Sequence, residues 1–232
     1  LMSSSPFFLG TNSLKDYRVH IYRHEVFADF PLQGQLLDYP HSLQEAFIRQ
    51  RETFEHWINL CEEKNTSSEG FDLLNTCWGP LRFSPRTLES RSSDTNLFSR
   101  VMALAAVYKG LINYIKEEKP NIEFGDETLS DVEYFVSKKG TITIPNHLKL
   151  KEYETAGINL GLDSNELRIY LSNILQLAQS YLKENEQKYL APFFEQISTR
   201  KTLADEIVIY ATQKGLEKDC SIDEKGAQEI RK

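Results

Sequence analysis

The chain has 232 residues, of which 40% are hydrophobic, 11% aromatic and 26% charged. This is a globular composition with enough apolar mass for a real core, and the length supports one large domain or two small ones. The formal net charge is -7, and the basic residues are interleaved with acids. Because phosphate contacts supply most of the affinity of nucleic-acid binders, this charge argues against a nucleic-acid partner.

The cysteines are few and widely spaced. Cys61, Cys77 and Cys220 form no CxxC pair, which excludes a zinc ribbon or a redox pair on spacing. An odd number of distant cysteines also argues against a disulfide framework. These features fit a reducing compartment, so we expect a cytoplasmic protein.

No segment is predicted to cross a membrane. The most apolar stretch, 101–115, has only fifteen residues and contains Lys109. A spanning helix needs about twenty apolar residues, so this stretch predicts a buried helix. The first eight residues lack a basic region and a long apolar run, so we expect no signal peptide there.

Residues 1–93 are predicted to form an N-terminal region of irregular and extended segments with one long helix. In 17–22, polar residues alternate with aromatic or aliphatic ones, the period of a half-buried strand. Ser42 and Glu45 form a capping-box pattern, after which apolar residues recur at helical spacing to about Lys64. We therefore expect minor β structure early in the chain and a helix over 42–64.

Residues 94–216 are predicted to form a helical domain. Asp94 is placed to cap a helix over about 95–118, whose apolar stripe is wide enough for a central helix contacted on several sides. Later helices are expected over about 145–160, 164–184 and 199–214, with a further segment after Pro192. The charged residues 217–232 are expected to form a flexible tail.

The segment 126–145 allows two interpretations. With a period of 3.6, Leu129, Val132, Phe135 and Val136 form a short helix followed by an extended 141–144. With a period of two, the same region forms a hairpin across 137–140. We favour the helix. The fold class is therefore mainly α (α+β at most), a multi-helix bundle with minor β structure in the N-terminal region and, in the hairpin alternative, at 132–144.

Motifs for bound groups are absent from the sequence. The two phosphate-binding glycine loops, GxxxxGK[ST] and GxGxxG, do not occur. No GxSxG nucleophile elbow, HExxH motif or acidic calcium loop is present either. His20 and His24 could share a metal ion on a helix, but on the predicted strand they lie about 13 Å apart. We therefore expect no metal and no cofactor.

One pattern points to catalysis. Arg51 and His56, in RETFEH, resemble the Arg-x4-to-6-His motif of HEPN-type ribonucleases, which are also all-helical. The resemblance covers six residues, and Glu52 stands where that family favours Asn, Asp or His. It implies that Arg51 stabilises charge on a scissile phosphate and His56 assists proton transfer, with two subunits contributing.

Aromatic residues in loops point to binding. Trp78, in a Trp-Gly-Pro loop, could plug the core or anchor a partner, and Phe7 and Phe8 form a second candidate anchor near the N-terminus. With no other catalytic pattern, we expect a non-enzymatic, cytoplasmic protein-interaction or assembly module, a subunit of a larger complex, with a protein partner or as a homo-oligomer. The alternative is a HEPN-like ribonuclease that uses Arg51 and His56.

Overall fold

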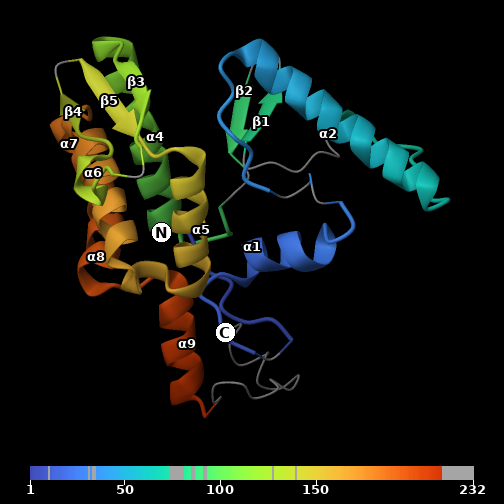
Figure 1. The fold of residues 1–232 in the computed structure, drawn as a ribbon. Helices are drawn as coiled ribbons and strands as arrows, with labels where there is room; N and C mark the ends of the chain where they lie inside the picture. The colour runs from blue at the N-terminus through green and yellow to red at the C-terminus, as the bar shows by residue number, and fades with distance from the viewer. Residues whose placement is uncertain are drawn as a thin grey trace. The chain divides into compact units, whose positions relative to one another are not determined.

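The computed structural model (Figure 1) describes residues 1–9, 11–30, 32, 35–73, 81–84, 87–90, 93–126, 128–138 and 140–215. The chain forms two compact units. One consists of Leu1–Tyr17 together with the chain from Asp94 onward, and the other of Arg18–Ser93. Each unit is described by itself.

The larger unit is built around three helices, α4 (Phe98–Glu118), α6 (Asn165–Ser180) and α8 (Ala191–Thr199). These helices contact one another pairwise (Figure 1). The core between them is formed by Ala103, Ala106, Val107, Leu175, Ala178, Leu182, Leu190 and Phe193. Its small residues lie on α4 and α6, so these two helices pack most closely.

The closest approach of α4 and α6 is at Gly110. A Cβ added to Gly110 would lie 2.2 Å from the backbone oxygen of Ala178. Real side chains do not reach such distances, so this position has room only for hydrogen. The glycine therefore sets the separation of the two central helices.

The first residues of the chain are held on the larger unit. Asp94 Oδ2 accepts hydrogen bonds from Ser4 N at 2.8 Å and Ser5 Oγ at 2.7 Å. The expectation that Asp94 caps the following helix is therefore wrong. The N-cap is Leu97, whose apolar side chain supplies no hydrogen bond, and the Asp94 carboxylate binds the N-terminal segment.

A three-stranded sheet follows α4, with strand order β3-β5-β4. Strand β5 lies parallel to β3 and antiparallel to β4. The strands span Asn121–Phe124 (β3), Ser137–Lys138 (β4) and Thr141–Ile144 (β5). The sequence analysis did not foresee β3.

The favoured helix over 126–145 is wrong, and the hairpin interpretation is confirmed only in part. A hairpin does form, but its first strand is Ser137–Lys138, inside the expected turn, and not the expected 132–136. Ser130 does cap a turn, but only the single 3-10 turn Asp131–Glu133 forms. Phe135 then adopts a φ of +59°, which breaks a helix, and Gly140, at φ +77°, lies between β4 and β5. Tyr134, directly after the 3-10 turn, is almost completely buried.

The remaining helices of this unit begin at side-chain caps. Asn146, Ser164 and Thr202 accept hydrogen bonds from backbone N–H groups of α5, α6 and α9 respectively. Helix α6 ends at Ser180, earlier than expected, and two short turns lead to α8. The bounds are His147–Asn159 (α5), Gly161–Asp163 (η3), Glu184–Gln187 (α7), Lys188–Leu190 (η4) and Leu203–Gln213 (α9).

The strand expected over 17–22 is wrong: these residues lie in helix α1 (Tyr17–Ile21) and at the start of the π-helical turn η1 (Tyr22–Val26). The Arg18 guanidinium lies over the Tyr22 ring, which stacks on Phe27. Residues four or five positions apart therefore contact each other on this helical segment. A helix also satisfies its backbone groups locally, whereas a strand requires a partner.

The smaller unit contains the long helix α2 (Leu43–Glu63) and the hairpin of β1 (Leu81–Ser84) and β2 (Thr87–Ser90). Ser42 Oγ accepts a hydrogen bond from Glu45 N at 3.1 Å, as the capping pattern predicts. Trp57 packs against the rings of Phe30, Phe54 and Phe71. The fold is mainly α with small sheets, as the sequence predicts.

A pair of glycine substitutions tests the contact between α4 and α6. We expect Gly110→Ala to lower the free energy of unfolding by about 2 kcal/mol, because its methyl group meets backbone that cannot move away cheaply. The control is Gly157→Ala in α5, where the added Cβ would meet only Leu167 Cδ2 at 3.8 Å. This control should gain about 0.5–1 kcal/mol from helix propensity. Urea unfolding measures both, and equal effects of the two substitutions would contradict the close contact.

Candidate interaction surface

Helix α4 has one side committed to the core of its own unit. The buried residues of this helix recur at intervals of three and four and share one face: Arg100, Ala103, Ala106, Val107, Gly110 and Tyr114. This face packs against α6, α8 and η4. The helix is thus central to its unit, but the expected burial on several sides holds for this face only.

The opposite side of α4 is also apolar, and it is exposed. Six residues at alternating spacings of three and four form this side, which we call the α4 stripe: Phe98, Val101, Ala105, Tyr108, Ile112 and Ile115. At 100° per residue, the stripe lies opposite the buried face. Phe98 is 79% exposed and Ile115 54% exposed, at the two ends of the helix.

The α4 stripe is comparable in area to the largest apolar patch of a typical monomeric protein, which is often functional. An aromatic side chain carries roughly 200 Å², so exposures of this size over six residues amount to on the order of 500 Å². A helix that is apolar on all sides is normally buried on all sides. The structure therefore assigns one face of α4 to the core and leaves the other available for contact.

The borders of the α4 stripe differ in charge. Along one border, Lys109 pairs with Glu186 of α7 at 2.6 Å, and Lys116 is exposed one heptad later. The hydrogen bond from Lys109 lowers the pKa of Glu186. Along the other border, Leu104 and Leu111 are half-buried against the core. The stripe thus carries little uncompensated charge.

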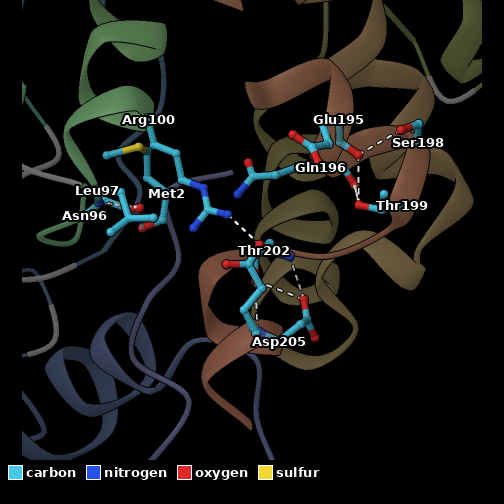
Figure 2. A network of polar contacts seen from close by, with 11 residues as sticks. Met2, Asn96, Leu97, Arg100, Glu195, Gln196, Ser198, Thr199, Thr202 and Asp205 are labelled. Atoms are coloured by element: carbon cyan, nitrogen blue, oxygen red, sulfur yellow. Dashed lines mark hydrogen bonds and ion pairs between the residues drawn. The ribbon is translucent and has the colours of Figure 1, made fainter. Parts of the chain in front are cut away.

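A polar network fixes the first turns of α4 (Figure 2). The buried Arg100 points toward Gln196 of α8 and toward the N-terminus of α9, where its Nη2 donates to Glu206 at 2.6 Å. With the Gln196 amide oriented to satisfy both neighbours, its oxygen accepts from Arg100 Nε at 3.0 Å and its nitrogen donates to the Leu1 carbonyl at 3.1 Å. This network holds α4, α8 and the first residues together.

A cleft of about 650 Å³ lies in the same unit, between the N-terminal segment and α9. Lys15 Nζ forms ion pairs there with Asp205 at 2.5 Å and with Asp163 at 3.6 Å. Asn12, which lines the cleft, has a buried Oδ1 with no hydrogen-bond partner among the described residues. The short pair of Lys15 with Asp205 holds the N-terminal segment on α9.

Phe7 and Phe8 belong to this fixed segment. Both are half-buried, and the Phe8 ring lies 6.1 Å from that of Tyr17. Their neighbour Leu9 is 85% exposed and adopts a positive φ. Trp78, the other aromatic residue predicted to anchor a partner, lies outside the described residues.

Arg51 and His56 lie on α2 but not on one face. Five helical residues separate them by about 140° around the axis. Arg51 is exposed, whereas His56 is half-buried, and its Nδ1 is enclosed without a hydrogen-bond partner in the part of the chain that the structure describes. Within one chain the two side chains therefore do not converge.

His20 and His24 lie closer together than the sequence predicted, because 17–26 is helical. Their ring centroids are 4.5 Å apart. Burial and the neighbouring charge of His24 lower the pKa of His20. Over the described ranges, however, no three His, Cys, Asp or Glu side chains gather as a metal site would require.

Comparisons of this chain with family models, curated proteins and solved structures found no match. Within the described residues, none of the helices combines the length and the apolar character that a membrane crossing needs. The surface must therefore be interpreted from its own geometry.

The sequence analysis identified α4 as apolar around most of its circumference but not which side the unit leaves uncovered. The missing signal was present in the sequence as two superposed patterns of threes and fours. One pattern contains Gly110, two alanines and a valine, which suit close helix packing, and the other contains Phe98, Ile112 and Ile115.

The Lys15–Asp205 pair predicts a pH dependence of stability. Burial would raise the pKa of Asp205, but hydrogen bonds from Lys15 and Thr202 outweigh burial and lower it. Burial would lower the pKa of Lys15, but Asp205 and Asp163 raise it. The contribution of Asp205 is thus present above about pH 4 and is lost as pH falls through its lowered pKa; that of Lys15 is present below about pH 10.4 and is lost as pH rises through its raised pKa.

We expect Asp205→Asn to lower the free energy of unfolding by about 1–3 kcal/mol at pH 7, and the difference from wild type to shrink below about pH 4. The control is Asp163→Asn, because this carboxylate is 61% exposed and more distant from Lys15. It should cost less than about 1 kcal/mol. Urea unfolding between pH 3 and 9 measures both, and a pH-independent loss in Asp205→Asn would contradict the ion-pair assignment.

Proposed function

We propose that this chain is a non-enzymatic, cytoplasmic protein-interaction or assembly module that works as a subunit of a larger complex. The observation that carries the proposal is the α4 stripe, an exposed apolar face on a helix whose other face is buried. Interaction sites are the usual reason for such a surface on a folded protein. The acidic net charge of -7 argues against a nucleic-acid partner.

The polar groups of the larger unit support the same proposal. Its buried charged residues, Arg100 and Asp94, are both engaged in holding helices and the N-terminal segment. Catalytic groups, in contrast, need reactive atoms directed toward a substrate. The few, widely spaced cysteines support a cytoplasmic location.

Affinity capture of the intact chain from its native extract tests the proposal. We expect the wild-type chain to retain a protein in stoichiometric amount, either another polypeptide or an untagged second copy. Ile115→Lys in the α4 stripe should lose it, because a lysine would place a charge in the apolar contact. The matched control is Leu148→Lys on α5, since Leu148 is 63% exposed but lies outside the stripe.

Two outcomes would count against the module. A wild-type chain that retains no protein and no second copy would overturn it. RNA cleavage by the wild type that is lost in His56→Ala and in Arg51→Ala would instead establish the ribonuclease alternative. In that case Arg51 and His56 would have to converge from two different subunits, because they diverge on α2.

A further inference from the structure

We propose that the α4 stripe is the two-fold interface of a homodimer, in which α4 packs antiparallel against α4 of a second copy. This inference rests on the proposed interaction function and adds the identity of the partner and the register of the contact. Its basis is the order of residue sizes along the stripe, the placement of charge at its borders and the area that it exposes.

The stripe is self-complementary when it is reversed. A two-fold axis that passes between Ala106 and Val107 places Phe98 opposite Ile115 of the second copy and Val101 opposite Ile112. All six positions are paired in this way, because their spacings of 3, 4, 3, 4 and 3 residues are identical in both chain directions. Such a pattern is the apolar seam of a two-stranded coiled coil, three heptads long.

Residue size distinguishes the antiparallel from the parallel arrangement. In the antiparallel register, the small Ala105 lies opposite the large Tyr108 on both sides of the axis. A parallel register would instead place Ala105 opposite Ala105 and Phe98 opposite Phe98, leaving a void in one layer and crowding in another. The antiparallel arrangement is favoured because it gives a uniform packing density along the interface.

The charges at the borders permit the same register. Lys109 lies close to the axis, but Glu186 already compensates its charge at 2.6 Å. The two copies of Lys116 would lie roughly 28 Å apart along the helices at 1.5 Å per residue. This separation is well beyond the Debye length of about 8 Å at physiological salt, so their repulsion is screened. On the other border, Leu104 lies near Leu111 of the second copy.

The exposed area is sufficient for a specific contact. Two copies of the stripe contribute on the order of 1,000 Å², the lower limit for a specific interface. The half-buried Leu104 and Leu111 and the aliphatic part of Lys116 extend the contact on both borders. A complete dimer of moderate affinity is therefore consistent with the surface.

Reciprocal charge substitutions test both the partner and the register. Light scattering of the purified full chain, over a range of concentrations, should give twice the chain mass for the wild type. Val101→Glu and Ile112→Lys should each weaken the dimer by about 100-fold or more, because each buries two unpaired charges. Mixing the two single variants should restore a dimer, since Glu at 101 then faces Lys at 112.

The mixture discriminates between registers, because in a parallel dimer position 101 faces position 101 and no pairing of opposite charge results. Leu148→Lys serves as the control and should remain dimeric. Circular dichroism confirms that each variant is folded.

Three results would overturn the homodimer. A wild-type chain that is monomeric at every concentration but retains another protein would leave the interaction function standing and reject the second copy. A dimer that neither substitution weakens would use another surface. A monomer that the substitutions destabilise without a change of mass would mean that a segment of this chain covers the stripe.

Discussion

The contact between Gly110 of α4 and the backbone of Ala178 on α6 is the constraint on which the larger unit depends. Because only hydrogen fits between Gly110 and the Ala178 oxygen, the two helices can approach until their backbones touch. Small residues around this point, Ala103 and Ala106, continue the close packing. This geometry fixes the rotation of α4 about its own axis, and the rotation decides which side chains face outward.

The fixed rotation has a consequence for the surface. Once Gly110 and Val107 face α6 and α8, Val101 and Ile112 lie on the opposite side of the helix, which is exposed. The N-terminal segment, held by Asp94 and by the pair of Lys15 with Asp205, covers other parts of the unit. The α4 stripe thus follows from core packing, and its exposure is not a matter of loose structure.

The sequence predicts the helix boundaries that are set by residues within one turn of the boundary. Ser42, Ser164 and Gly161 are at helix boundaries because capping oxygens and left-handed glycines act within one turn. The alternation in 17–22 misled because a two-residue period says nothing about whether a partner strand exists. Asp94 misled because its binding partner, Ser4, lies ninety residues away.

The hairpin at 137–144 shows the same limit. The local pattern of the segment favours a helix, whereas the burial of Tyr134 and the parallel pairing of β5 with β3 accompany the extended form. Both features depend on tertiary contacts, which the sequence of the segment does not contain. The candidate surface was hidden in a similar way, since the sequence contains both apolar faces of α4 but not the identity of the helix that covers one of them.

The rigidity of α4 bears directly on what its outer face can bind. Arg100, in the first turn of α4, hydrogen-bonds to Gln196 of α8 and Glu206 of α9. Lys109, in the middle of α4, forms an ion pair with Glu186 of α7, and Tyr114 is buried near the end of the helix. The exposed side chains are therefore displayed on a scaffold that loses little backbone freedom when a partner docks. Preorganisation of this kind lowers the entropic cost of association, so a stripe of modest area can support specific binding. The same clamps make a rigid partner of matching heptad spacing, such as a second α4, a better complement than an extended peptide.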